Sequence, residues 1–182
     1  IANRLSLRQP QRDALDILDR VCEIVKPEKD IDLARAIDVI RSEFPTVTDF
    51  ERDFPSLCFA LATGVGKTRL MGAFIAYLYR AEKIRHFFVL APNLTIYNKL
   101  IADFTPNTPK YVFQGIGEFA NRPPEMITGD TYESGRGVRQ PTLGIEGYED
   151  DRVHVNIFHI SNITSEVRRG ACPGLMPPGT TL

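Results

Sequence analysis

One glycine-rich stretch constrains the fold of this chain more than any other feature: residues 61–68 read Leu-Ala-Thr-Gly-Val-Gly-Lys-Thr. The stretch follows a short apolar run, residues 57–60, that predicts a buried strand, and it precedes an amphipathic run, residues 69–79, that predicts a helix. A loop between a strand and a helix presents backbone N–H groups and the positive end of the helix to an anion. The stretch therefore predicts a phosphate-binding loop in an α/β fold.

The residue types in this loop match the chemistry of a bound nucleotide. Gly64 and Gly66 permit a positive φ and a close approach of the backbone to phosphate oxygens. Lys67 would contact the β and γ phosphates of ATP, and the Thr68 hydroxyl would ligate Mg²⁺. We therefore assign Lys67 and Thr68 as candidate catalytic residues, and Thr68 as the candidate metal ligand.

The loop departs from the general pattern G-x-x-x-x-G-K-[ST] at its first position, where Leu61 replaces glycine. The Gly-x-Gly-Lys-Thr core at 64–68 is intact, and Thr63 and Val65 complete the candidate cofactor-binding residues. The alternative is a chance glycine-rich turn before an unrelated helix, and the flanking strand and helix patterns argue against it.

Composition limits the class of protein. Of the 182 residues, 43% are hydrophobic and 25% are charged, which is typical of a globular chain. No apolar run reaches the roughly 18 residues that a membrane span needs, so we expect no membrane partner and a cytoplasmic location. The net charge of −1 gives no overall attraction to nucleic acid, although a groove needs only a local basic patch.

The cysteines do not indicate a disulfide framework, because Cys22, Cys58 and Cys172 are far apart and odd in number. Cys22 and Cys58 lie in apolar runs, so we predict that both are small core residues. The histidines lack metal-ligand spacing to any cysteine, and we predict no structural metal.

The rest of the chain predicts further helices and strands. Apolar residues at helical spacing predict a helical preamble over residues 9–44, with two helices ended by Pro27 and Pro45. Another helix follows the glycine-rich loop, and a fourth begins with Asn93 or Thr95 as its cap. Short strands are predicted over residues 85–92, 110–114, 125–128 and 152–160.

These elements predict an α/β fold with a mostly parallel sheet flanked by helices. The strand over residues 85–92 is apolar almost throughout, which is typical of a strand buried on both faces. The core around the phosphate loop covers residues 55–114. Residues from about 131 to 151 are rich in glycine and charge and predict a long mobile loop, and residues 170–182 predict an irregular tail.

A phosphate loop needs a second acidic group, a carboxylate at the end of a buried strand, to hold Mg²⁺ and position the attacking water. Asp103 lies on a predicted helix, and Asp130 follows only a weak strand pattern. Neither fits, so we expect an incomplete nucleotide-binding domain that lacks the catalytic half of the site.

Four stretches resemble motifs of superfamily 2 helicases. Residues 62–68 look like motif I of the restriction-enzyme branch, and residues 89–95 resemble motif Ia. Residues 7–11, Leu-Arg-Gln-Pro-Gln, are similar to the Leu-Arg-x-Tyr-Gln element upstream of motif I, with Pro10 in place of the aromatic residue. Residues 156–162 resemble the strand before the Asp-Glu-x-His box in the restriction subunit of type III enzymes and related DEAD/DEAH-like proteins.

This resemblance implies that residues 1–182 form a single partial RecA-like domain, an incomplete P-loop NTPase. It implies a parent protein that hydrolyses ATP as an ATP-dependent DNA translocase or helicase-like subunit of a restriction system. ATP and Mg²⁺ would be the cofactors, double-stranded DNA a partner, and a modification methyltransferase subunit a candidate partner. Without the DEAH box and the second domain, we expect the chain alone to be inactive as a hydrolase.

The resemblance also implies roles for single residues. Gln11 would pair with the adenine base, residues 63–68 would bind the phosphates and Mg²⁺, and Pro92, Asn93 and Thr95 would face the DNA backbone. The alternative for Asn93 and Thr95 is simple helix capping, and the alternative for Gln11 is a solvated residue of a first helical turn.

Two other functions remain open at this point. The first is a nucleotide-binding regulatory or interaction module that does not handle DNA. The net acidity favours it, and the upstream glutamine together with the motif Ia-like strand disfavours it. The second is a small-molecule kinase, which fits poorly because a helical preamble, residues 9–44, precedes the glycine-rich loop.

Overall fold

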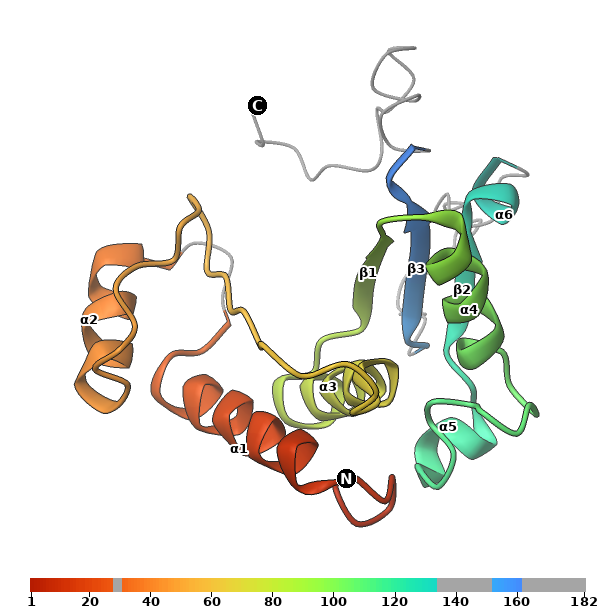
Figure 1. Ribbon diagram of the computed structural model, residues 1–182, viewed down its shortest axis with the longest axis horizontal. Helices are drawn as coiled ribbons and strands as arrows, with labels where there is room; N and C mark the ends of the chain where they lie inside the picture. The colour runs from red at the N-terminus through yellow and green to blue at the C-terminus, as the bar shows by residue number, and fades with distance from the viewer. Residues whose placement is uncertain (28–30, 134–151, 162–182) are drawn as a thin grey trace, which may run out of the picture. The chain divides into compact units, whose positions relative to one another are not determined.

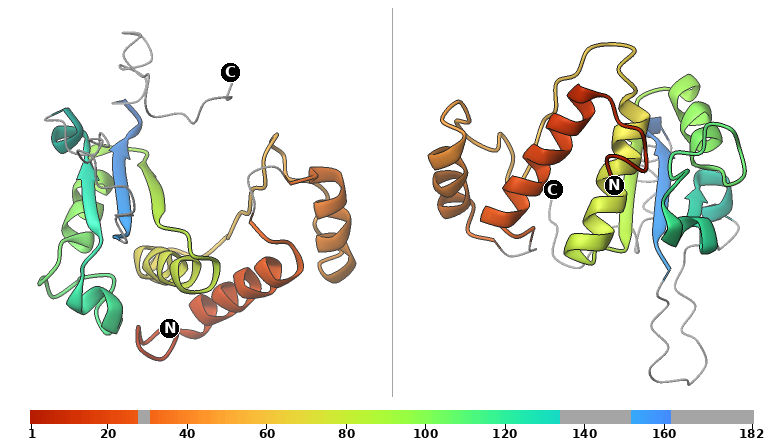
Figure 2. Two further views of the ribbon diagram at one scale, coloured as in Figure 1. Left: turned by 180° about the vertical axis from the view of Figure 1, so that it is seen from behind. Right: turned by 90° about the horizontal axis from the view of Figure 1, so that it is seen from below.

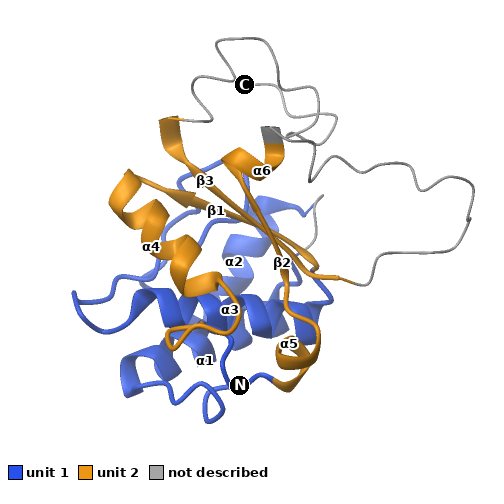
Figure 3. Ribbon diagram, turned by 90° about the vertical axis from the view of Figure 1, so that its right-hand side faces the viewer, with its two compact units in different colours: residues 1–84, 112–116 blue, residues 85–111, 117–182 orange. Residues whose placement is uncertain are grey.

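The structure is a computed structural model that describes residues 1–27, 31–133 and 152–161. Most of the predicted mobile loop and all of the predicted tail lie outside these ranges. The chain divides into two compact units, each described by itself (Figure 3). Unit 1 comprises residues 1–84 and 112–116, and unit 2 comprises residues 85–111 and 117–182.

The described residues of unit 1 form three helices, all of them predicted. They are α1 (Gln9–Ile24), α2 (Leu33–Glu43) and α3 (Lys67–Glu82). Figure 1 shows α1 lying beside α3, and α1 also contacts α2. Pro10 stands in the first turn of α1, where a missing N–H costs nothing, and the Asp32 carboxylate caps α2 by accepting from the N–H of Arg35 at 3.1 Å. The buried face of α1 follows the helical spacing read from the sequence.

The N-terminal segment is part of the core of unit 1. Leu5 and Leu7 are buried, and the Arg69 guanidinium of α3 donates to the carbonyl oxygen of Leu5 at 3.1 Å. Gly115 has φ +93, and a Cβ there would lie 2.5 Å from the carbonyl oxygen of Arg4. Only glycine therefore fits where residues 112–116 pass the N-terminal segment.

A second core cluster joins α1 and α2. Its buried members are Val21, Ala36, Ile40 and Phe50. An exposed ion pair between Arg20 of α1 and Glu43 of α2 spans the same two helices, but solvent screens it and it contributes little. Apolar packing, and not the ion pair, therefore holds α2 in place.

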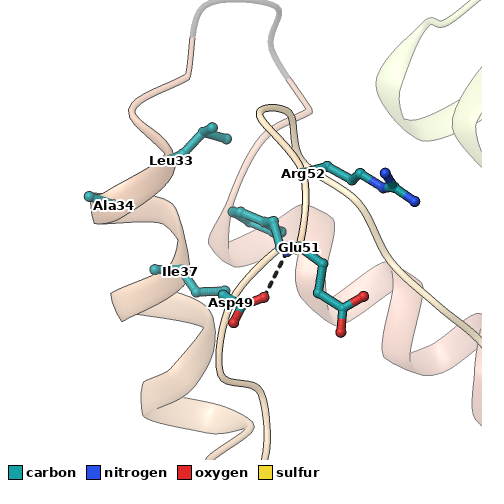
Figure 4. Close-up of a pocket in the computed structure, with 7 residues that line it drawn as sticks. Leu33, Ala34, Ile37, Asp49, Glu51 and Arg52 are labelled. Atoms are coloured by element: carbon teal, nitrogen blue, oxygen red, sulfur yellow. Dashed lines mark hydrogen bonds between the residues drawn. The ribbon is translucent and has the colours of Figure 1, made fainter.

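A hollow of about 530 Å³ opens between α2 and residues 49–52 (Figure 4). Its labelled lining residues are Leu33, Ala34, Ile37, Asp49, Glu51 and Arg52. The Asp49 carboxylate accepts from the N–H of Glu51 at 2.7 Å and holds that residue at φ +54. None of these residues belongs to the predicted nucleotide site.

Two predicted strands are wrong. Residues 57–60 are irregular, with Leu57 44% exposed, and no strand that the structure describes pairs with them. Residues 110–114 form turns, and Tyr111, Val112 and Phe113 are buried in succession instead of alternating. An apolar run becomes a strand only when a neighbour supplies a hydrogen-bonding ladder, which composition does not reveal.

Unit 2 contains a parallel three-stranded sheet of order β1-β3-β2. Its strands are β1 (His86–Ala91), β2 (Glu125–Thr128) and β3 (His154–His159), which confirms three predicted strands and the parallel sheet. Helix α4 (Leu94–Phe104) packs on β1 and β3. The left view of Figure 2 shows β3, in blue, between β1 and β2.

Two short helices of unit 2 were not predicted. They are α5 (Gly117–Asn121) and α6 (Gly129–Glu133). α6 packs on β2 and β3 and occupies residues 131–133, so the predicted loop does not begin at residue 131. The turn forms because the Thr131 hydroxyl accepts from the N–H of Thr128 at 2.7 Å, a local bond that periodicity does not detect.

The prediction that the strand at 85–92 is buried on both faces is wrong. Val89 and Ala91 are buried, whereas Phe88 and Leu90 are 50% and 46% exposed. One face of β1 carries the buried residues, and the other exposes Phe88, whose ring stacks on Phe158 at 5.4 Å between centroids. Within the described ranges, no helix is long and apolar enough to cross a membrane.

The cysteine prediction is right for Cys22 and wrong for Cys58. Cys22 is buried on α1, whereas Cys58 is exposed because the segment that carries it is not a strand. Burial, followed by the charge of Glu82, raises the pKa of the Cys22 thiol to about 11. At pH 8 roughly one Cys22 in a thousand is therefore a thiolate.

We expect iodoacetamide at about pH 8 to alkylate Cys58 at least about tenfold faster than Cys22, because the thiolate is the nucleophile and Cys22 is shielded. Peptide mass spectrometry of a time course measures the two rates separately. The rates should converge in urea, which is the control. Equal rates in the folded protein would contradict the placement of both side chains.

Candidate functional site

The phosphate-loop stretch has the backbone geometry that its glycines predict. Gly64 lies at φ +77 and Gly66 at φ +94, both in the left-handed region that favours glycine. Gly66 caps α3, and the helix begins at Lys67. The N-terminus of a sixteen-residue helix therefore lies at the Gly-Lys-Thr sequence.

The first turn of α3 offers groups that suit a phosphate. Its leading N–H groups lack partners inside the helix, and the turn contains no acidic side chain. The Lys67 side chain is exposed, and no described residue accepts a hydrogen bond from its ammonium group. Thr68 is half-buried on the same turn, and a Cβ built at Gly64 would meet nothing within 4 Å. This open space beside free donors is what a polyphosphate chain needs.

The other two predicted residues of the loop are close by in sequence and differ in exposure. Thr63 is exposed and Val65 is half-buried. Thr63 directly precedes Gly64, and Val65 lies between the two glycines. Their contacts with a nucleotide stay predictions.

The structure brings Gln11 against the loop. The Gln11 amide nitrogen donates to the carbonyl oxygen of Gly66 at 2.8 Å, and the amide oxygen accepts from the N–H of Arg8 at 2.8 Å. Gln11 is 2% exposed, so the solvated alternative does not describe it. Because both ends of the amide contact protein, its pairing with adenine stays a prediction.

Sequence reasoning missed the side chain of Arg8. Its guanidinium donates to the carbonyl oxygen of Gly64 at 3.4 Å, a long hydrogen bond on the exposed side of the loop. Arg8 is the arginine of the Leu-Arg-x-x-Gln element, so its place three residues before Gln11 was the available signal.

The packing of α1 on α3 positions Gln11. Six α1 residues are buried: Gln11, Ala14, Leu15, Leu18, Val21 and Cys22. Farther along the two helices, burial, followed by the effect of Asp19 on α1, raises the pKa of the Tyr77 phenol on α3. Apolar contact therefore holds α1 along α3 while the start of α1 meets the loop.

The residues predicted to face DNA lie in unit 2, where β1 leads into α4. Pro92, Asn93 and Thr95 are all exposed. Asn93 is the N-cap of α4, and its side-chain oxygen accepts from the N–H of Ile96 at 2.9 Å. The capping alternative thus describes Asn93, whereas Thr95 lies inside the helix and is not its cap. Contact with DNA stays a prediction for all three.

The two acidic residues weighed from sequence both lie in unit 2. Asp103 lies on helix α4, as its spacing predicts, and is buried there. Asp130 is exposed on α6 directly after β2. The strand before Asp130 is therefore real, although the sequence pattern for it was weak.

A family model described as the type III restriction enzyme, res subunit, matches residues 4–170. The chain belongs to this family. The family establishes the predicted fold class, an α/β P-loop domain of RecA-like type, here with three parallel strands flanked by helices. It also establishes the coarse function class, an ATP-dependent, helicase-like domain of a restriction subunit. Comparisons with curated proteins and with solved structures returned no match.

We expect Asn93→Ala to lower the free energy of unfolding by about 1 kcal/mol, because it removes the cap of α4. Asn93→Asp should lower the free energy of unfolding by only a few tenths of a kcal/mol, since aspartate caps a helix as well as asparagine does. Urea unfolding measures both values. Asn98→Ala on the exposed side of α4 is the matched control and should cost nothing measurable. Equal losses for the alanine and aspartate variants at position 93 would show that the cap does not stabilise α4.

Proposed function

We propose that residues 63–68 bind the triphosphate of ATP together with Mg²⁺, as part of an ATP-dependent DNA translocase or helicase-like subunit of a restriction system. The observation that supports this most is local. Two glycines at positive φ lead directly into the N-terminus of α3, at a Gly-Lys-Thr sequence, in a chain of the type III restriction family.

Each group of the loop has a separate task in this proposal. The N–H groups at the start of α3 bind phosphate oxygens, and the Lys67 ammonium contacts the β and γ phosphates. Mg²⁺, which spreads the charge of the phosphates, is held by the Thr68 hydroxyl. A hard cation suits that oxygen, and Thr68 stands on the same helical turn as the phosphate-binding N–H groups.

The proposal for this chain alone is binding without turnover. Phosphoryl transfer to water needs a carboxylate that positions the water and groups that stabilise the developing charge. The sequence assigns no such carboxylate, so hydrolysis is proposed for the parent protein. There, double-stranded DNA would contact Pro92, Asn93 and Thr95, and a modification methyltransferase subunit is a candidate partner. A cytoplasmic location goes with these partners.

A second candidate function is a nucleotide-binding regulatory or interaction module that does not handle DNA. The net charge of −1 and the engagement of Asn93 as a helix cap favour it. The two functions share the nucleotide site and differ only in whether unit 2 contacts DNA.

We expect calorimetric titration to show binding of Mg-ATP to the chain, and Lys67→Ala to weaken it at least about tenfold, because a charged hydrogen bond to phosphate contributes about 1.5–3 kcal/mol. Lys99→Ala, which removes an exposed lysine of α4, is the matched control and should leave the affinity unchanged. ATP affinity that is equal in the wild type and in Lys67→Ala would refute the phosphate-loop assignment.

For DNA, we expect the chain to bind a labelled duplex weakly, with an affinity that falls as salt rises. Asn93→Asp keeps the cap of α4 and places a negative charge beside the predicted phosphate contact, so it should weaken binding severalfold at low salt and less at high salt. Fluorescence anisotropy measures both. An affinity that does not change in Asn93→Asp would show that Asn93 does not contact DNA. An absence of DNA binding at any salt concentration would favour the second function.

A further inference from the structure

The Gln11 side chain links two elements that are far apart in the sequence. It is buried in the first turn of α1 at 2% exposure, and a buried amide must satisfy both its donor and its acceptor. It does so by bonding the N–H of Arg8 and the carbonyl oxygen of Gly66, each at 2.8 Å. One side chain therefore joins the start of α1 to the last residue of the phosphate loop.

The bonded carbonyl belongs to the peptide group that precedes Lys67. A peptide group is planar and trans, so its C=O and N–H point in opposite directions. A hydrogen bond that fixes the oxygen of Gly66 therefore also fixes the direction of the Lys67 N–H. That N–H is one of the unpartnered donors at the start of α3, where the phosphate would bind.

The contact is tight as well as polar. A Cβ built at Gly66 would lie 2.8 Å from the Gln11 amide nitrogen, and φ at Gly66 is +94. Glycine at position 66 is therefore required twice, by the backbone conformation and by the closeness of Gln11. The same carbonyl oxygen also accepts from the N–H of Leu70 at 3.1 Å. Gln11 and the first turn of α3 therefore bond the same oxygen atom.

We propose that Gln11 is a positioning residue of the phosphate loop: its amide orients the Gly66–Lys67 peptide so that the Lys67 N–H faces the phosphate. This role rests on the proposed nucleotide site, and it differs from reading the adenine base. A residue that orients the loop affects every polyphosphate, with or without a base. A residue that only reads the base affects ATP alone.

The deciding ligand is inorganic tripolyphosphate with Mg²⁺, which has no base. We expect Gln11→Ala to weaken Mg-tripolyphosphate and Mg-ATP by the same factor, about tenfold, the value for about 1.4 kcal/mol. Gln9→Ala is the matched control, because Gln9 lies in the same helical turn and its amide bonds only Asp13 on the exposed side. Calorimetry with all three proteins gives the ratios.

Gln11→Glu separates positioning from a general loss of structure. Its ionised carboxylate can still accept from Arg8 but cannot donate to Gly66, whereas its protonated form can do both. Its affinity for tripolyphosphate, relative to that of the wild type at the same pH, should therefore recover as the pH falls from about 8 to about 5, because burial raises the pKa of a carboxyl. The ratio for Gln11→Ala should stay constant over this range.

The outcomes are distinct. Loss of ATP binding in Gln11→Ala with unchanged tripolyphosphate binding would overturn the proposal in favour of base reading, and a pH-independent ratio for Gln11→Glu would overturn it as well. If the wild type binds neither ligand, or Lys67→Ala binds both as well as the wild type does, the nucleotide site itself fails. Thermal unfolding of each variant identifies any that is unfolded, and the pH ratio of Gln11→Glu then decides alone.

Discussion

The candidate site depends on one hydrogen bond, from the amide of Gln11 to the carbonyl oxygen of Gly66. A glycine-rich loop has many accessible conformations, and fixing them costs about 1–2 kcal/mol of backbone entropy per residue. The bond limits this freedom at the residue where the loop becomes a helix. Because Gln11 is itself held by the N–H of Arg8 and by the packing of α1 on α3, the constraint originates in the core of unit 1.

The same constraint explains how the N-terminal segment contributes. Leu5 and Leu7 are buried, and the Arg69 guanidinium of α3 holds the carbonyl oxygen of Leu5. The chain then enters α1 through Arg8, whose guanidinium contacts the loop at Gly64. Residues that precede the loop by more than fifty positions therefore support it through these contacts. An intact Gly-Lys-Thr sequence is therefore only one part of the structure that holds the loop.

Helices were predicted better than strands for a physical reason. A helix forms its hydrogen bonds within itself, so the apolar spacing in α1, α2, α3 and α4 sufficed to locate them. A strand needs a partner, and apolar runs at 57–60 and 110–114 were predicted as strands although no described strand pairs with them. The exposure of Phe88 and Leu90 on β1 has the same origin, since sequence does not say what covers a face.

Within the site, features formed by neighbouring residues were predictable from the sequence, and a contact between distant residues was not. The positive φ values at Gly64 and Gly66 and the start of α3 are local properties, and the motif predicts them. The motif resemblance predicts that Gln11 lies near a bound nucleotide, but the bond from Gln11 to Gly66 joins residues 55 positions apart and had no local signal. Residues 11 and 66 therefore act as one unit: the amide needs a glycine opposite it, and the loop needs the amide to orient its last peptide. A change at either residue alters what the other can do, which is why neither can be interpreted from its own motif alone.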